Sequence, residues 1–340
     1  MRNQIFYLYV NGNRVTPSTR LRWLNYIDDF KAAGWDVRVL ECAPSRSERR
    51  IQFESMEKGS TILVQKKLLA FAELKQLKSR SGSLFLDVDD AIWRTHPHKG
   101  NPYVNFLKKV YKRVFLLSAI PLYDKIICAN EALAFDLRPI NPRIDIVPTS
   151  PSDSETTGVV KDDEIFRIVW TGTRANFFYL DEIKDQITSF LKGHDRAELC
   201  VISDGEYSID GSSSQIRNIP WSTDNESLWI QKSSLGIMPL TLDEWSRGKS
   251  AFKLIKYMKL GLPVMATDFG FQKDMIKSGE NGILVDNSDW QKVLNRLFDN
   301  PLHLQQMAEA GHQTYLDSYA PEIIFKAYLE IFKTVKEAVQ

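Results

Sequence analysis

The chain has 340 residues, of which 43% are hydrophobic, a length and composition that suffice for two globular cores. Its 44 Lys and Arg residues nearly balance its 43 Asp and Glu residues, so we expect no bulk attraction to nucleic acid. Three widely separated cysteines exclude a disulfide framework and a Cys-x-x-Cys metal site, and favour buried thiols in a reducing cytosol. No apolar run approaches the ~20 residues of a membrane span, so we expect a cytoplasmic protein.

Short apolar runs alternate along the chain with segments of helical periodicity. This alternation is typical of βαβ units and predicts an α/β fold with parallel sheets. The strands expected in the first half are Ile5–Val10, Val37–Leu40, Thr61–Val64, Leu84–Asp87, Lys125–Cys128 and Ile144–Val147. Those expected in the second half are Phe166–Trp170, Leu199–Ile202, Leu235–Pro239, Val264–Ala266 and Ile283–Val285.

A polar stretch separates the two halves of the chain. Residues 151–163 are rich in Ser, Thr and Asp and predict a linker between a domain at 1–150 and a domain at 164–318. After the second domain, residues 319–340 have the periodicity of an amphipathic helix.

Carboxylates follow the expected strand at Leu84–Asp87. Asp87 and Asp89 point to the same side if the strand continues, at the carboxyl end where ligands of open α/β sheets gather. An Asp-x-Asp string can also hold a divalent metal against a diphosphate, and carboxylates that close a strand often cap the next helix. His96 and His98 in the following loop are either a metal pair or solvated side chains.

The segment 247–285 predicts two helix–strand pairs, with basic residues at the opening of the first helix. Ser250 is its expected N-cap residue, and Gly248 before it allows close backbone approach. Lys249 and Lys253 are four residues apart and would share one helix face. An anion placed there would meet unpaired N–H groups and two ammonium groups, although such a lysine pair is also typical of a solvated face.

Two strings in this segment, KLIKYMKLGLPVMA and GFQKDMIKSGENGILV, resemble the signature of the retaining GT-B glycosyltransferases of family four, also called group 1. Upstream, EIFRIVWTGTRANFFYL, ISDGE and SSLGIMPL are similar to other parts of that family's donor-binding domain, and LFLDVDDAIW and YDKIICANEAL follow the family's order in the first half. The resemblance implies two facing Rossmann-like domains with a C-terminal crossover helix.

The resemblance also implies roles for individual residues. Lys253 and Lys249 would stabilise the leaving diphosphate, whereas Asp87 and Asp89 would bind sugar hydroxyls or orient the acceptor across the cleft. Lys256 stands where the family has the Glu that binds the ribose, and an ammonium has no acceptor. Either Lys256 faces elsewhere, or the donor differs, with weaker discrimination between ribose and deoxyribose, or catalysis has been lost. The remaining donor-binding residues would be Gly172, Thr173, Arg174, Trp221, Ser222 and Gly248.

The function that this resemblance implies is sugar transfer with retention, from a nucleoside-diphosphate donor to a saccharide or lipid-linked acceptor of a surface polysaccharide or glycoconjugate. Lysines and helix termini would replace a metal, so no cofactor is expected. A nucleotide-sugar epimerase of the same fold and a non-catalytic partner subunit remain alternatives. The basic amphipathic stretch 104–117 predicts either peripheral contact with the inner face of the cell membrane or a plain docking helix.

Overall fold

A computed structural model describes residues 4–338, apart from 14–15, 95–101, 152–163 and 212. The loop histidines His96 and His98 and nearly all of the predicted linker lie outside the described residues. Contacts between residues group the chain into two units. Unit 1 comprises Met1–Ser150, Asp243–Ser250 and Pro321–Gln340, and unit 2 comprises Pro151–Leu242 and Ala251–Ala320.

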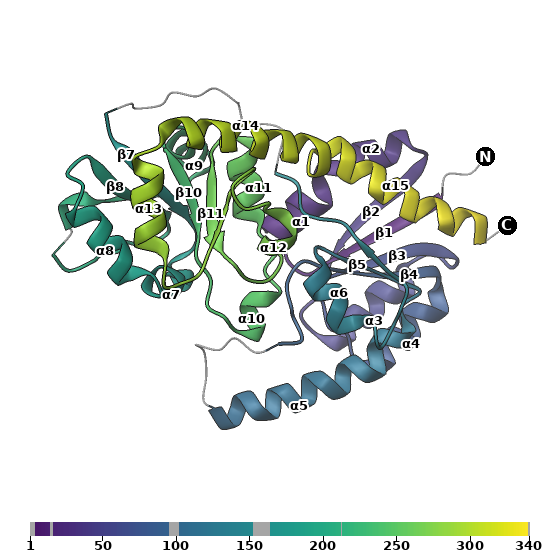
Figure 1. The fold of residues 1–340 in the computed structure, drawn as a ribbon. Coiled ribbons are helices and arrows are strands. Elements are labelled where there is room, and N and C mark those ends of the chain that lie inside the picture. The colour runs from purple at the N-terminus through teal and green to yellow at the C-terminus, as the bar shows by residue number, and fades with distance from the viewer. Residues whose placement is uncertain (1–3, 14–15, 95–101, 152–163, 212, 339–340) are drawn as a thin grey trace. The chain divides into compact units, whose positions relative to one another are not determined.

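Unit 1 contains one six-stranded sheet, sheet A, in the order β2-β1-β3-β4-β5-β6 with all pairs parallel. Figure 1 labels its strands β1 to β5. The register pairs Val10 of β1 with Gln65 of β3, and Gln65 with Asp87 of β4, so the residues that follow these strands share one edge. The strands are β1 (Gln4–Val10), β2 (Trp35–Glu41), β3 (Ser60–Gln65), β4 (Ser81–Val88), β5 (Lys125–Cys128) and β6 (Ile144–Ile146).

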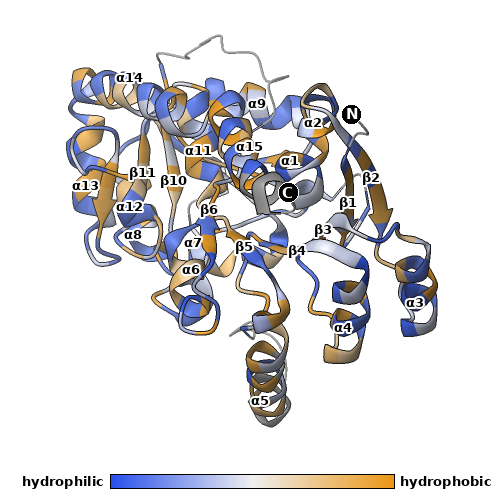
Figure 2. Cartoon of the chain, turned by 90° about the vertical axis from the view of Figure 1, so that its right-hand side faces the viewer, coloured by the Kyte–Doolittle hydropathy of each residue, from blue (hydrophilic) through white to orange (hydrophobic). Residues whose placement is uncertain are grey.

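Helices cover both faces of sheet A (Figure 2). Phe6 and Leu8 of β1 face a cluster with α2 and the C-terminal helix α15, whereas Tyr7 and Tyr9 face a cluster with α3 to α6, as the two-residue period of a strand requires. The helices of unit 1 are α1 (Pro17–Arg22), α2 (Ile27–Ala32), α3 (Arg46–Ser55), α4 (Phe71–Arg80), α5 (Pro102–Ala119), α6 (Glu131–Leu137), α10 (Glu244–Arg247) and α15 (Pro321–Ala338).

Unit 2 contains the parallel sheet B, in the order β12-β11-β10-β7-β8-β9. Trp170 of β7 faces a cluster with α8 and α13, and its neighbour Val169 faces a cluster with α9 and α11. The strands are β7 (Phe166–Thr171), β8 (Ala197–Ser203), β9 (Ile216–Pro220), β10 (Leu235–Met238), β11 (Val264–Thr267) and β12 (Ile283–Val285). The helices are α7 (Phe178–Asp181), α8 (Lys184–Lys192), α9 (Thr223–Gln231), α11 (Phe252–Lys259), α12 (Gln272–Met275), α13 (Trp290–Phe298) and α14 (Pro301–Ser318).

The α/β fold class predicted from the sequence is confirmed. Every predicted strand is present, with ends that shift by a few residues, and the terminal amphipathic helix is α15. Strand β9 was not predicted, because Ile216–Pro220 is a short edge strand that lacks a strong apolar run. In the part of the chain that the structure describes, no helix is long and apolar enough to cross a membrane.

Candidate functional site

Sheet B has a switch point between β7 and β10, because the chain extends the sheet through β8 and β9 on one side and through β11 and β12 on the other. Ligands of open parallel sheets bind outside the carboxyl ends of the strands at such a point. Strand β7 ends at Thr171 and β10 ends at Met238. The segments that follow Thr171 and Met238 are therefore well placed for binding.

Lys253 lies above an aromatic ring at this edge. Its Nζ is 5.4 Å from the centre of the Trp170 ring, within the range of a cation–π contact. Trp170 is buried, and a Cβ atom on Gly172 would lie only 2.5 Å from the indole. The turn glycine thus makes room for the ring that supports the lysine, and two of the predicted donor-binding residues belong to one packed group.

The turn after β7 is tied to the turn after β8. The backbone N–H of Arg174 donates to Oδ1 of Asp204 at 2.6 Å, and this bond lowers the pKa of the Asp204 carboxyl. The stem of Arg174 lies across Gly205, where a Cβ atom would be 2.8 Å from Arg174 Cδ. Oγ1 of Thr173 accepts from Asn176 Nδ2 at 3.1 Å. The Arg174 N–H is therefore already used, and its exposed side chain is the group that can meet an anion.

Helix α11 is anchored to the sheet through Tyr257. Its hydroxyl accepts from the Thr171 N–H at 3.1 Å, and its ring lies 2.5 Å from the position of a Cβ atom on Gly236. The prediction that Ser250 caps this helix is wrong, because the N-cap residue is Ala251 and no side chain caps it. Ala251 has a left-handed φ of 51°, which turns the chain just before the helix begins.

Lys256 is buried and paired. Its Nζ lies 2.7 Å from Oε2 of Glu226 on α9. Trp221 Nε1 donates to the same oxygen at 3.1 Å, and the Trp221 residue is 49% exposed. Ser222 is the N-cap residue of α9, where its Oγ accepts from the Asn225 N–H at 3.1 Å. Trp221 and Lys256, two of the predicted donor-binding residues, therefore contact one carboxylate, whereas Ser222 caps the helix that carries it.

The carboxyl edge of sheet A carries a buried ion pair. NH2 of Arg22 lies 2.5 Å from Oδ1 of Asp87, and both side chains are 0% exposed. Trp23 Nε1 donates to Oδ2 of Asp87 at 2.8 Å, and Arg22 NH1 donates to the Val147 carbonyl at 2.9 Å. Burial is the largest single influence and acts against the charge of Arg22, but the charge and hydrogen bonds of Asp87, together with other nearby acidic groups, outweigh it and raise the pKa of Arg22. A direct contact between Asp87 and a substrate would require this pair to open.

Lys66 follows β3 at the switch point of sheet A, which lies between β1 and β3. Its Nζ is 2.9 Å from Oδ1 of Asp89 and 2.8 Å from Oδ2 of Asp90. Burial disfavours charge on Asp89, but Lys66 and Arg22 outweigh it and lower the Asp89 pKa. Lys66 has a left-handed φ of 51°, a strained conformation that clusters at functional sites.

The Asp-x-Asp string is thus shared between two cations, since Asp87 faces Arg22 and Asp89 faces Lys66. Among the described residues, no group of three or more His, Cys, Asp or Glu side chains could hold a metal ion.

The segment Asp243–Ser250 belongs to unit 1 by its contacts. Asn130, the N-cap residue of α6, donates to the Lys249 carbonyl at 3.2 Å, and Lys249 Nζ is 3.5 Å from Oδ1 of Asp90. A Cβ atom on Gly248 would come within 3.0 Å of a leucine side chain of α6. The close approach at Gly248 is therefore to the protein itself. Because α11 begins only at Phe252, Lys249 does not share a helix face with Lys253, which corrects the expectation from their spacing.

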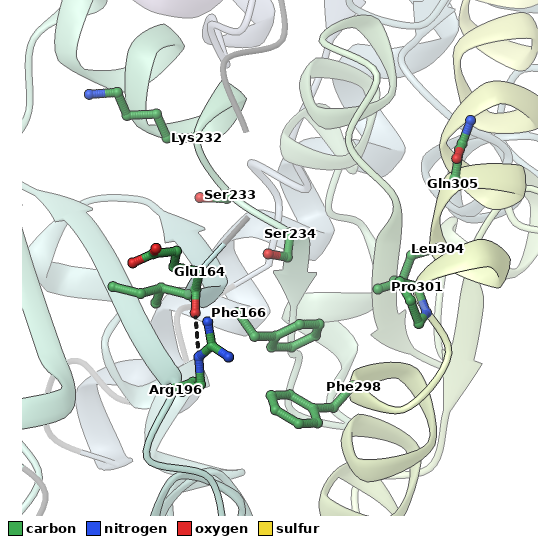
Figure 3. A pocket seen from close by; sticks show the side chains of 11 residues that line it. Glu164, Phe166, Arg196, Lys232, Ser233, Ser234, Phe298, Pro301, Leu304 and Gln305 are labelled. Atoms are coloured by element: carbon green, nitrogen blue, oxygen red, sulfur yellow. Dashed lines mark hydrogen bonds between the residues drawn. The ribbon is translucent and has the colours of Figure 1, made fainter. Parts of the chain in front are cut away.

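A cavity of about 420 Å³ lies at the opposite, amino end of sheet B (Figure 3). Phe166 at the start of β7, Arg196 before β8 and Ser234 before β10 line it, together with Phe298 of α13 and Leu304 of α14. Since ligands of parallel sheets bind at the carboxyl ends of strands, this cavity is separate from the switch-point site.

Residues 166–300 match the family model described as glycosyl transferases group 1. Sucrose-phosphate synthase from Thermosynechococcus elongatus has a similar structure, with a TM-score of 0.70 and 11% identity over 98% of this chain and 100% of that one. Anabaena Alr3699/HepE in complex with UDP and glucose has a TM-score of 0.67 and 11% identity, over 98% of this chain and 99% of that one. The chain has the GT-B glycosyltransferase fold.

The GT-B resemblance inferred from the sequence is thereby confirmed, and the group 1 match covers sheet B together with its switch point. S. aureus TarM is also similar, with a TM-score of 0.63 and 12% identity over 84% of this chain, but the chain spans only 57% of TarM. No curated protein sequence matches the chain significantly. The roles assigned to individual residues stay predictions.

Four residues of these edges were not singled out from the sequence. Arg22, Lys66, Asn130 and Glu226 make their key contacts with residues far away in the chain, up to 127 positions for Arg22. Only Lys66 carries a local signal, since it lies two residues after the predicted strand Thr61–Val64, as Asp89 lies two residues after the predicted strand Leu84–Asp87.

Proposed function

We propose that this GT-B protein is a retaining, family-four glycosyltransferase that moves a hexosyl or deoxyhexosyl group from a nucleoside-diphosphate sugar to a saccharide or lipid-linked acceptor. Unit 2 would hold the donor and unit 1 the acceptor, in synthesis of a surface polysaccharide or glycoconjugate. The observation that carries the proposal is Lys253 above Trp170 at the end of β7, inside the group 1 match. Anabaena HepE was solved with UDP and glucose, and we extend that donor class to this chain.

Lys253 would bind the leaving diphosphate. Fixed positive charge near the developing charge of the leaving group is the largest single contribution in many enzymes. Arg174, Lys249 and the N–H groups at the start of α11 would add donors, and the turn at Gly172 and Thr173 would let the diphosphate approach the backbone. We propose that these groups replace a metal ion.

In the proposed reaction the acceptor attacks the sugar from the face that the diphosphate leaves, so the anomeric configuration is retained. The bond from the anomeric carbon to the diphosphate oxygen breaks, the bond to the acceptor oxygen forms, and a phosphate oxygen takes the acceptor's proton. Asp89, whose pKa is lowered against burial by Lys66 and Arg22, would orient acceptor hydroxyls. Asp87 would act indirectly, by fixing Arg22 and the end of β4.

The test combines ligand binding with product analysis. We expect one nucleoside diphosphate among UDP, GDP, ADP and dTDP to raise the melting temperature selectively, and its sugar conjugate to be consumed only with an acceptor. NMR of the product should show the donor's anomeric configuration, and excess EDTA should leave the rate within about two-fold. Donor turnover without acceptor would identify an epimerase, and binding of no nucleoside diphosphate would favour a partner subunit. Loss of activity in EDTA, restored by Mg²⁺ or Mn²⁺, would contradict the metal-independent mechanism.

We further propose that α5 attaches the protein to an anionic membrane. Six large apolar residues of α5 are 48 to 64% exposed, and orange residues recur along this helix in Figure 2: Phe106, Leu107, Val110, Tyr111, Val114 and Leu117. Basic residues alternate with them in the sequence, at 108, 109, 112 and 113. An exposed apolar stripe with cationic flanks is the composition of an interfacial helix.

Vesicle sedimentation tests this attachment. We expect the protein to bind phosphatidylglycerol vesicles more than phosphatidylcholine vesicles, and Phe106→Ser with Tyr111→Ser to abolish the difference. Leu302→Ser removes a residue that is equally exposed, at 64%, on α14 and should have no effect. Equal binding of all these proteins to both vesicles would contradict the proposal.

A further inference from the structure

Two helices of unit 2 are joined by a buried ion pair for which the transfer mechanism above has no use. Nζ of Lys256 on α11 lies 2.7 Å from Oε2 of Glu226 on α9, and the two side chains are only 4% and 12% exposed. Removing two charges from water is costly, and apolar side chains of similar size often join helices at least as well. The pair therefore calls for a functional explanation.

Two further donors position the Glu226 carboxylate. Thr171 Oγ1 donates to Oε1 at 2.6 Å, and Trp221 Nε1 donates to Oε2 at 3.1 Å. Because Thr171 is the last residue of β7, the carboxylate lies at the switch-point edge of sheet B. An ionised carboxylate has about four lone-pair directions, and the three donors just named, all from described residues, leave acceptor capacity on Oε1.

The groups around Glu226 match the parts of a nucleoside diphosphate. The half-exposed indole of Trp221 offers a stacking surface for a base, and a carboxylate oxygen accepts from vicinal hydroxyls. Lys253, the proposed diphosphate ligand, lies over the ring of Trp170, which precedes Thr171 in β7. An isolated carboxylate would repel a nearby diphosphate, but Lys256 balances the charge of Glu226 while leaving it an acceptor.

We propose that Glu226 is a specificity-determining residue that accepts hydrogen bonds from the ribose hydroxyls of the donor, with Lys256 and Thr171 holding its carboxylate in place. This inference rests on the proposed function of unit 2 as the donor site. It revises the expectation drawn from Lys256 alone, because the acceptor that α11 lacks is supplied by α9. The protein then prefers ribonucleotide donors over their 2′-deoxy analogues.

Calorimetric titration with three probes tests the inference: UDP, 2′-deoxy-UDP and inorganic pyrophosphate. We expect wild-type protein to bind UDP about 10-fold more tightly than 2′-deoxy-UDP, since a hydroxyl bonded to a charged acceptor is lost. In Glu226→Gln this ratio should fall toward one, while pyrophosphate affinity stays unchanged. Glu309→Gln makes the same chemical change on the exposed face of α14 and should behave as wild type.

A second variant protects the test against misfolding. Glu226→Gln alone leaves Lys256 buried opposite a neutral partner, whereas Glu226→Gln with Lys256→Gln removes both charges together. The double variant should keep the wild-type melting temperature more closely and should lose the ribose preference equally.

The outcomes separate the two levels of inference. A retained ribose preference in folded Glu226→Gln, or equal weakening of UDP and pyrophosphate, would overturn the assignment of Glu226 and leave the donor site standing. Equal wild-type affinity for UDP and 2′-deoxy-UDP would do the same. If wild-type protein bound no nucleoside diphosphate at all, the proposed function and this inference would both fail.

Discussion

The carboxyl edges of the two sheets differ in the groups that contact their cations. In sheet A the charged groups cancel one another locally, since Asp87 pairs with Arg22 and Asp89 pairs with Lys66. In sheet B the cation at the switch point, Lys253, lies over the Trp170 ring. We call the carboxyl edge of sheet A the scaffold edge, and that of sheet B, where we propose that the donor binds, the ligand edge.

The comparison also separates two kinds of buried carboxylate. Asp87 is completely buried, and its partner Arg22 ties α1 to β4 and to the chain after β6. Glu226 is only partly buried and lies beside the exposed Trp221. Burial of the carboxylate thus distinguishes a group that holds the fold from one that can still accept a hydrogen bond.

The largest expected effect is on the scaffold edge. Asp87→Asn leaves Arg22 as a buried cation without its counter-charge, which should lower the free energy of unfolding of unit 1 by about 3–5 kcal/mol. Urea titration with hydrogen exchange of unit 1 amides measures it. Asp28→Asn removes the exposed pair with Lys31 and should change little. Equal, small losses in both variants would show that the buried pair does not stabilise the scaffold.

The next effect is on the ligand edge. Lys253→Ala should leave the melting temperature nearly unchanged but reduce transfer by about 100-fold or more, on the order of 3 kcal/mol of transition-state stabilisation. Steady-state kinetics measures the loss, with the donor sugar of the nucleoside diphosphate that the binding screen selects. Lys292→Ala, an exposed lysine of α13, is the matched control and should transfer at the wild-type rate. An unchanged rate in Lys253→Ala would remove the basis of the donor-site assignment.

A smaller effect should follow from the packing under the ligand edge. Gly236→Ala places a Cβ atom 2.5 Å from the ring of Tyr257, which anchors α11 to Thr171. The strain should cost roughly 1–3 kcal/mol of unit 2 stability and should weaken diphosphate binding, because α11 carries Lys253. Thermal unfolding and pyrophosphate titration check the two parts. Gly193→Ala is the control, because Gly193 has ordinary backbone angles and an added Cβ atom would make no close contact. Gly279→Ala would not serve, because the φ of Gly279 is 90°.

The smallest effect concerns pH. The pKa of Asp89 is lowered in the folded protein, so its interactions stabilise the fold above the unfolded pKa of about 3.9 and are lost as the pH falls through the folded pKa. Lys66, whose pKa is raised, keeps its charge throughout this acid range. The stability difference between wild type and Asp89→Asn should therefore be constant near neutral pH and shrink in acid. A difference that is independent of pH down to the acid transition would contradict this.

The fold could be predicted from the sequence because it depends on local patterns. Runs such as Ile5–Val10 and Phe166–Trp170 are apolar, lie between helical segments and give parallel strands in either half. The edge strand β9 was missed because Ile216–Pro220 mixes polar and apolar residues and is only partly buried. The prediction that Ser250 caps α11 was wrong because nothing in the local sequence indicates that Ala251 adopts a left-handed conformation.

The candidate site was only half accessible from the sequence. Lys253 and Gly172 follow from motifs, but the pairs Arg22–Asp87 and Glu226–Lys256 join residues 65 and 30 positions apart. Such partners are brought together by strand order and register, which one sequence does not reveal. The sequence shows that Lys256 replaces the family's Glu, but only the structure shows its partner, Glu226 of α9.

Helix α15 has a consequence for exchanging halves between proteins of this fold. Phe332 of α15 lies 4.8 Å from Phe6 and 5.4 Å from Phe85, measured between ring centres. Helix α15 therefore completes the hydrophobic core on one face of sheet A in unit 1. A chimera that joins the first 150 residues to another protein's donor domain and C-terminal helix would pack this core against side chains that do not match it. A chimera should therefore take Pro321–Ala338 and the N-terminal residues of unit 1 from the same protein.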